Sequence, residues 1–237
     1  MRSLSILLSV VLLLGVSAAA WAQRTLPSTE IQQIVQLGTP PQETGATTID
    51  SFDSYRVWGY QTGVTNVWDV WLDGYGDPTN GAIVGNATGQ EPQEPYLELS
   101  NVAGGTGLAL PFNYDNTTAT RSEATRTFDP AQDLTRENAT ALVLWVRGPL
   151  GNVQPTDDVY VVLRDGTARD TIQIATAQAV LNLPQGTPVA WRKVTIPLNT
   201  LTIDPTKLTS MTIGVGNPAT PVNGGAGMVY IDNIGLE

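Results

Sequence analysis

The feature that most constrains this chain is a succession of short β-type runs separated by turn-forming pairs, which extends from Thr47 to the C terminus. The runs are rich in Val, Ile, Thr, Tyr and Trp, and pairs such as Asp73-Gly74 stand between them. The predicted strands are 48–53, 68–72, 82–84, 96–100, 107–114, 121–128, 141–147, 158–164, 171–176, 191–196, 210–215 and 228–236. Strands at this spacing, with no convincing helix among them, predict an all-β fold, a single β-sandwich of the jelly-roll type over residues 47–237.

The first 22 residues have the pattern of a secretory signal peptide. Arg2 supplies the positive charge, residues 4–16 are apolar, and residues 20–22 form a small-x-small cleavage site. The apolar run is shorter than the ~20 residues that a membrane span needs. Residues 23–46 then form a leader whose apolar spacing predicts a short helix. We therefore expect a secreted protein, extracellular, on the cell surface or periplasmic, with no membrane insertion after cleavage.

Two residue types are missing from the whole sequence, cysteine and histidine. Without Cys no disulfide can stabilise an exported domain, and a bound metal is a natural substitute. Without His, the Ser-His-Asp and Cys-His types of catalysis and His-ligated zinc sites are excluded. The formal net charge of -10 argues against nucleic acid and against anionic membranes as partners.

An acidic residue, Asp232, lies inside the apolar last strand. Alternation along a strand places it on the same side as Ile234, and a buried carboxylate without a partner costs several kcal/mol. Residues 48–55, at the start of the predicted domain, are also apolar and acidic, with Asp50 and Asp53. We therefore expect the first and last strands to lie side by side and to direct carboxylates at one hard cation.

Five sequence blocks add a second argument. They are IDSFDSY at 49–55, WLDGY at 71–75, GGTGLAL at 104–110, WRKVTIPL at 191–198 and VYIDNI at 229–234. Together they resemble the calcium-containing jelly-roll modules of the galactose-binding-like type. That group includes many carbohydrate-binding modules, and similar domains occur in large secreted bacterial proteins.

The resemblance implies a structural Ca²⁺ ion held by Asp53, Asp232 and the backbone carbonyls around Gly104 and Thr106. Family members often carry Glu at the position of Asp53, so we expect Asp50 or a water molecule to supplement the shorter side chain. Hard Ca²⁺ takes oxygen ligands of these kinds. The alternative is that the two acidic residues only cap turns or face solvent.

Sugars are bound by flat aromatic faces together with a few polar groups. In one predicted strand Trp145 and Arg147 lie on the face opposite the apolar residues. We predict that they form part of a ligand platform, that Tyr160 extends it, and that Arg121 and Glu123 add hydrogen-bonding groups nearby. The alternative is that Trp145 belongs to the core, as a Trp within an apolar strand usually does.

A second group of aromatic residues lies in a segment rich in Gly, Thr and Asn. Because such a loop cannot bury every ring, Trp58, Tyr60 and Tyr75 are further predicted ligand contacts. Trp71, which belongs to one of the five blocks, is expected to be structural.

These observations predict a non-catalytic domain that binds extracellular or cell-surface glycans. The alternative is a structural or adhesive protein of a surface or matrix that binds other surface proteins. A glycan-active enzyme is less favoured, because a glycosidase needs two facing carboxylates. No spacing convincingly pairs the available acidic residues, which are Glu98, Glu123, Asp157 and Asp158.

Overall fold

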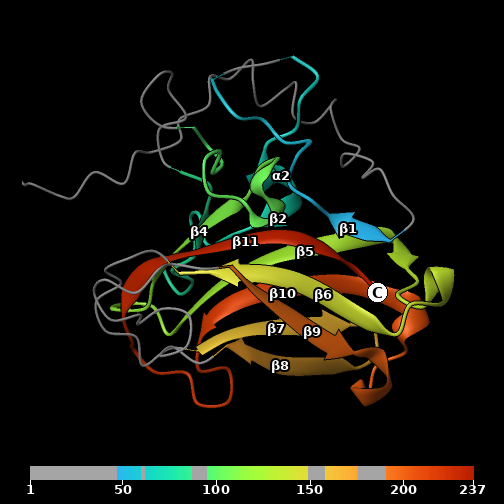
Figure 1. Cartoon of the computed structure of the whole chain (residues 1–237). Coiled ribbons are helices and arrows are strands. Elements are labelled where there is room, and N and C mark those ends of the chain that lie inside the picture. The colour runs from blue at the N-terminus through green and yellow to red at the C-terminus, as the bar shows by residue number, and fades with distance from the viewer. Residues whose placement is uncertain (1–46, 60–61, 87–94, 149–157, 176–190) are drawn as a thin grey trace, which may run out of the picture.

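The computed structural model describes residues 47–59, 62–86, 95–148, 158–175 and 191–237. Two antiparallel sheets make up the fold (Figure 1), and their inner faces enclose one hydrophobic core. The predicted all-β sandwich is confirmed. The predicted signal peptide, leader and Tyr60 lie outside the described residues. Within the described ranges, no helix has the length and apolar character required to cross a membrane.

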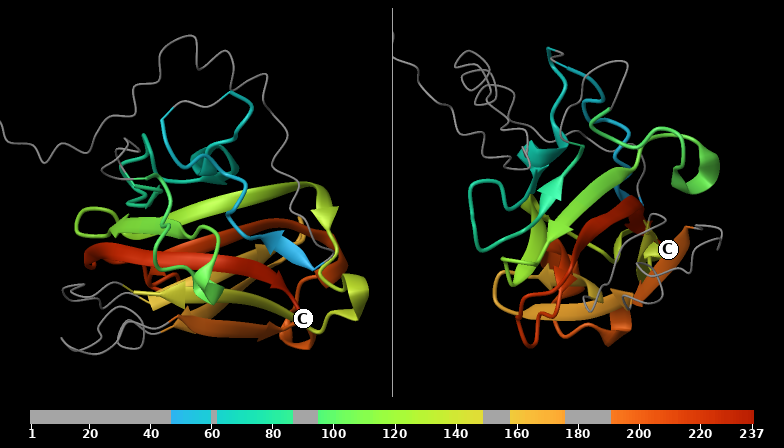
Figure 2. Two further views of the ribbon diagram at one scale, coloured as in Figure 1. Left: turned by 45° about the horizontal axis from the view of Figure 1, so that its top comes forward. Right: turned by 90° about the vertical axis from the view of Figure 1, so that its left-hand side faces the viewer.

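One sheet contains six strands: β1 (Thr48–Asp50), β3 (Ile83–Val84), β4 (Leu110–Asp115), β6 (Ala141–Arg147), β9 (Arg192–Pro197) and β11 (Ala226–Leu236). Their order is β3–β4–β11–β6–β9, and β1 pairs with the far end of β11. Thr48 lies opposite Gly235, so the expected pairing of the first and last strands is confirmed. Figure 2 shows β1 beside β11.

The other sheet contains five strands: β2 (Trp71–Leu72), β5 (Arg121–Gln132), β7 (Asp158–Arg164), β8 (Arg169–Ala175) and β10 (Leu208–Gly216). Their order is β2–β5–β10–β7–β8. The described helices are short: α2 (Val67–Val70) and the 3-10 turns η1 (Ala103–Gly105), η2 (Arg136–Asn138), η3 (Leu198–Thr200) and η4 (Pro205–Lys207).

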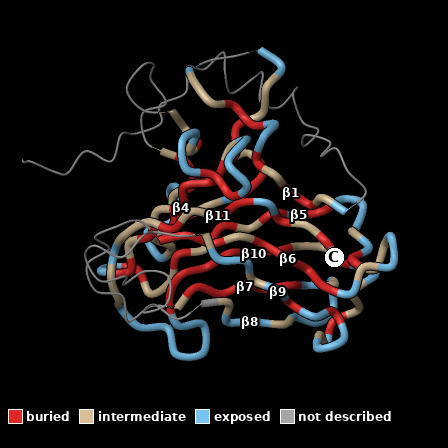
Figure 3. Tube along the Cα trace, in the orientation of Figure 1, coloured by how far each residue is buried: buried red, intermediate tan, exposed pale blue. Residues whose placement is uncertain are grey.

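The core lies between the sheets because alternate residues of each central strand are apolar. Figure 3 shows the buried inner strands and the exposed loops around them. Side chains that are buried on the inner faces include Leu142, Leu144 and Val146 of β6, Val159, Val161 and Leu163 of β7, and Met211, Ile213 and Val215 of β10.

One predicted strand, 68–72, is confirmed only at its end, and another, 96–100, is wrong. Residues 68–72 form the single turn α2 followed by the short β2, because helical spacing brings Val67, Val70 and Trp71 together on one buried side. An extended chain would place Trp68 and Trp71 on opposite faces. Residues 96–100 contain only one isolated bridge, between Glu98 and Ala109.

The last strand departs from simple alternation. The register between β11 and β6 shifts between Asp232 and Gly235, and Asn233 has a φ of 46°. This bulge turns the chain so that Ile231 and Ile234 both join the core. The predicted placement of Ile234 on the side of Asp232 is therefore wrong.

A buried hydrogen-bonded group connects the two sheets at Asp50, the last residue of β1. Its Oδ1 accepts from the backbone N–H of Phe52 at 2.9 Å. Its Oδ2 accepts from the Tyr55 hydroxyl at 2.8 Å, the Trp71 indole N–H at 2.7 Å and Arg126 Nη1. Arg126 belongs to β5 of the opposite sheet, so a fully buried carboxylate pairs with a cation from across the sandwich.

Arg126→Met removes the cation but keeps the length of the side chain. We expect a loss of about 3 kcal/mol in the free energy of unfolding, because Asp50 stays buried with three neutral donors and no counter-charge. Urea denaturation measures the loss. Lys207→Met is the matched control, because it breaks an exposed pair with Asp204 and is expected to change stability by less than about 1 kcal/mol. Equal effects of the two substitutions would contradict the central role of the buried pair.

Candidate functional site

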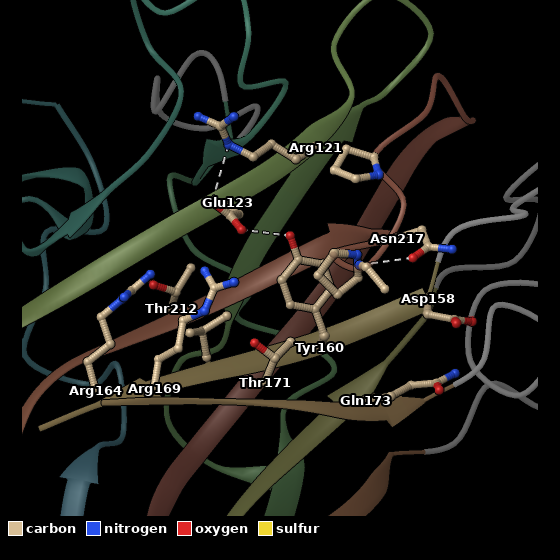
Figure 4. Close-up of a pocket in the computed structure, with 14 residues that line it drawn as sticks. Arg121, Glu123, Asp158, Tyr160, Arg164, Arg169, Thr171, Gln173, Thr212 and Asn217 are labelled. Carbon is tan, nitrogen blue, oxygen red and sulfur yellow. Dashed lines mark hydrogen bonds and ion pairs between the residues drawn. The ribbon is translucent and has the colours of Figure 1, made fainter. Parts of the chain in front are cut away.

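The outer face of the second sheet is hollowed into a cleft of about 630 Å³ (Figure 4). Strands β5, β10, β7 and β8 line it, together with Asn217, Pro218, Ala219 and Pro221 after β10. The side chains that face it alternate with the core residues of the same strands, so strand geometry determines which residues are exposed to the cleft.

Cross-strand pairing arranges the central part of the cleft. Gly214 of β10 lies opposite Glu123 of β5 on one side and Tyr160 of β7 on the other. The Tyr160 ring packs directly over Gly214, where a Cβ atom would come within 2.3 Å of the Tyr160 Cζ atom. Tyr160 is 1% exposed, so its ring belongs to the floor of the cleft.

Glu123 is held by two neighbours (Figure 4). The Tyr160 hydroxyl donates a hydrogen bond of 2.8 Å to Glu123 Oε1, and Arg121 Nε lies 3.3 Å from Glu123 Oε2. The rim and walls add further polar side chains, among them Thr171 and Gln173 of β8. The middle of the cleft is therefore a fixed polar network over an aromatic floor.

The structure divides the predicted ligand platform between two sheets. Arg121, Glu123 and Tyr160 lie together in the cleft, but Trp145 and Arg147 belong to β6 of the other sheet. The prediction of one shared face is wrong, because β6 pairs with β11 and β9 whereas β5 and β7 flank β10. Sequence patterns show which residues share a side of one strand but not which strands are neighbours.

The contacts of Arg147 are those of a residue that stabilises the fold. Its side chain is buried, and its guanidinium carbon lies 4.0 Å from the Tyr230 ring centroid and 5.3 Å from that of Trp191. Its Nη2 is 3.5 Å from Glu98 Oε2 and 3.4 Å from the Asn101 carbonyl. Arg147 thus fastens a loop over the outer face of the first sheet, where it is not accessible to a ligand.

The other predicted aromatic contacts lie outside the cleft. Trp145 is partly exposed, with Lys193 and Asp232 as its cross-strand neighbours. Trp58 is also partly exposed, and Tyr75 is 53% exposed.

The predicted cation ligands Asp53 and Asp232 both contact the loop formed by residues 103–108. Asp232 is 1% exposed; its Oδ2 accepts from the Ala103 backbone N–H at 2.8 Å, and its Oδ1 accepts from the Asn233 N–H at 2.7 Å. Asp53 Oδ1 accepts from the Leu108 N–H at 2.7 Å. The two carboxylates therefore hold opposite ends of the segment that contains Gly104 and Thr106.

The electrostatics of this loop are unfavourable without a cation. Burial raises the pKa of Asp232 to about 7, and the charges of Asp53 and Asp50 raise it as well, against two backbone hydrogen bonds that lower it. In the described ranges no ion pair joins Asp232 or Asp53 to a basic side chain.

The oxygen donors at this loop fit a hard divalent cation, provided that carbonyls of the loop complete the ligand set. Among the described residues no cluster of three or more His, Cys, Asp or Glu side chains could hold a metal by itself. Asp50 has other partners, because its carboxylate accepts four hydrogen bonds, two of them from Trp71 and Arg126 of the opposite sheet.

Neither a family model nor a curated protein sequence matches this chain. Similar solved structures include an exo-beta-agarase, with 13% identity and a TM-score of 0.43 over 60% of this chain and 22% of that one. They also include the CBM22-1 xylan-binding domain of Paenibacillus barcinonensis Xyn10C, with 11% identity and a TM-score of 0.42 over 83% of this chain and 97% of that one.

A third is CBM27-1 of Caldicellulosiruptor saccharolyticus in complex with mannohexaose, with 16% identity and a TM-score of 0.41 over 71% of this chain and 96% of that one. Two of these three are carbohydrate-binding modules, the group that the sequence blocks resemble. Similarity at this level carries no inference about ligand or metal, and the sandwich architecture rests on the strand pairing described above.

In calcium-free buffer, we expect the stability of the chain to fall as the pH rises from about 4 to about 7. The pKa of Asp232 is about 7 in the folded protein against an ordinary 3.8, so in this window the folded state binds a proton that the unfolded state has lost. Carboxylates with a lowered pKa, such as Asp204 at about 2, titrate below the window.

Melting temperatures measured across this pH range test the sign. The Asp232→Asn variant does not titrate and should lose the slope. A wild-type stability that rises over the same window would contradict the assignment.

Proposed function

We propose that this chain is a secreted, non-catalytic domain that binds a polysaccharide in the cleft of the second sheet and carries a structural calcium ion. The observation that carries the proposal is the cleft itself. It extends along the whole of β7, since Asp158 and Arg164, the first and last residues of that strand, both line it. Six residue steps of an extended strand correspond to about 20 Å, long enough for several sugar units.

The lining has the mixed character that a sugar requires. Tyr160 and Val162 supply apolar surface in the floor, while Thr171, Gln173 and Asn217 supply hydrogen-bonding groups around it. A sugar ring presents C–H groups on its faces and hydroxyls at its edge, so both kinds of surface find a counterpart.

The acidic residues of the cleft support binding without catalysis. Glu123 and Asp158 both line it. The two Glu123 oxygens are engaged by Tyr160 and Arg121, whereas a glycosidase needs one carboxyl group to protonate the leaving group and a second to act on the opposite side of the sugar.

The calcium ion would be held by Asp53, Asp232 and the backbone carbonyls around Gly104 and Thr106. When bound, it supplies the counter-charge that two neighbouring carboxylates lack and ties the loop to the last strand. The ion would have a structural role, and its site would lie on the first sheet, away from the cleft.

Thr171→Trp should abolish polysaccharide binding or weaken it at least tenfold, because an indole at this exposed position fills the middle of the cleft. Depletion of the protein by a panel of insoluble polysaccharides, and affinity electrophoresis with soluble ones, measure binding. Thr195→Trp is the matched control, since Thr195 is an exposed strand residue of β9 in the opposite sheet.

The same assay separates the competing sites. Loss of binding in Trp145→Ala, with Thr171→Trp unaffected, would move the site to the first sheet. A folded protein that binds no polysaccharide would favour a structural role at a surface or in a matrix.

Removal of calcium with EGTA should lower the melting temperature by roughly 5 to 10 °C if the ion is present at about 100 times its Kd. Asp232→Ala should melt lower in calcium and should not respond to EGTA. Asp133→Ala removes an exposed carboxylate in a turn and should keep the wild-type response. Indifference of the wild-type protein to EGTA would disprove the calcium site.

A further inference from the structure

Two arginines face each other at one end of the cleft (Figure 4). Arg164 of β7 and Arg169 of β8 are direct cross-strand partners, and both side chains are exposed to the cleft. Like charges directly opposite each other destabilise a pair of strands. Among the described residues no acidic side chain forms an ion pair with either guanidinium.

The acidic residues next to them in sequence are engaged elsewhere. The Asp165 carboxylate accepts hydrogen bonds from the backbone N–H groups of Ala168 and Asp204. The Asp170 carboxylate accepts from the backbone and hydroxyl of Thr202. These carboxylates are committed to loop structure, so they do not supply the missing counter-charge at the cleft.

The cleft differs in charge from the rest of the molecule. The protein carries a formal net charge of -10, but the cleft is lined by three arginines and only two acidic residues. Glu123 is already paired with Arg121. Asp158 lies at the other end of β7 from Arg164, about 20 Å away along the strand. The positive charge is therefore concentrated at the Arg164–Arg169 end.

We propose that the polysaccharide bound in the cleft is anionic, with a carboxylate or sulfate group held between Arg164 and Arg169. This inference rests on the proposed glycan binding and adds the chemical class of the ligand. The planar guanidinium group presents paired N–H donors that match a carboxylate or sulfate. An anion in this position also relieves the repulsion between the two cations. Thr171 is exposed two residues along β8 from Arg169, on the same face of the strand, and its hydroxyl supplies a hydrogen bond to the sugar that carries the anion.

Matched polymer pairs test the charge requirement with the full chain. Dextran sulfate is compared with dextran, and polygalacturonate with its fully methyl-esterified form, by affinity electrophoresis and titration calorimetry. We expect the charged member of at least one pair to bind at least about tenfold more tightly. Its binding should weaken as the salt concentration is raised to about 1 M, because exposed ion pairs are screened. The pair that responds distinguishes sulfate from carboxylate.

A double variant locates the interaction. Arg164→Gln with Arg169→Gln should reduce binding of the charged polymer at least about tenfold. The matched control, Arg192→Gln with Lys207→Gln, removes the same charge from exposed positions outside the cleft and should bind like the wild type.

The outcomes separate the two proposals. Equal binding of charged and neutral polymers would overturn the anionic assignment, and so would undiminished binding of the charged polymer by the double variant. Glycan binding in the cleft would still stand in either case if Thr171→Trp abolished the binding. Binding of only neutral polysaccharides has the same meaning. No binding to any polymer would overturn glycan binding itself, and the anionic assignment with it.

Discussion

The buried ion pair between Asp50 and Arg126 is the interaction on which the architecture most depends. Strand β1 has only three residues and, among the described strands, pairs only with the end of β11, so sheet pairing alone holds it weakly. The side-chain carboxylate of Asp50, the last residue of β1, reaches across the sandwich to Arg126 and also accepts a hydrogen bond from Trp71, the first residue of β2. One acidic side chain thereby connects the start of the domain with both sheets. The carboxylate is stable in the core because charged and neutral donors surround it.

The Asp50 carboxylate also accepts a hydrogen bond within the turn that leads to the candidate cation site. The backbone N–H of Phe52 donates to Asp50, and Phe52 has a φ of 65°, so the chain turns sharply just after β1. The turn directs Asp53 out of the core toward the loop that Asp232 holds from β11. Two acidic residues only three positions apart thus have different environments. Asp50 is neutralised by protein donors, whereas Asp53 and Asp232 have no basic partner among the described residues.

The two outer faces of the sandwich also differ in whether their charged side chains have partners within the protein. On the first sheet, Arg147 packs against Tyr230 and Trp191 and fastens the loop near Glu98 over the surface. On the second sheet, Gly214 leaves room for the Tyr160 ring to pack over it, and the surface above the ring stays open as the cleft. Arg147 is therefore covered on the first sheet, whereas Arg164 and Arg169 are exposed to the cleft, which is why we place the ligand on the second sheet.

Local patterns in the sequence were sufficient to predict much of the fold. Alternation of apolar residues predicted β6 and β7 with the bounds that the structure shows, because side chains alternate along any extended strand. The acidic residue in the last strand and the matching segment at the start predicted the pairing of β1 with β11. The same reasoning identified Arg121, Glu123 and Tyr160, which do meet in the cleft.

Other features depend on contacts between residues far apart in the chain, which local patterns do not contain. The assignment of β6 to one sheet and of β5 and β7 to the other separated Arg147 from Tyr160. The bulge at Asn233 reversed the side on which Ile234 lies, and Arg126, 76 positions from Asp50, supplied a partner that no motif indicated. Strand periodicity is a property of the local backbone and can be read from the sequence. Neighbouring strands, bulges and buried partners follow from tertiary packing, because they are selected by the free energy of the whole sandwich.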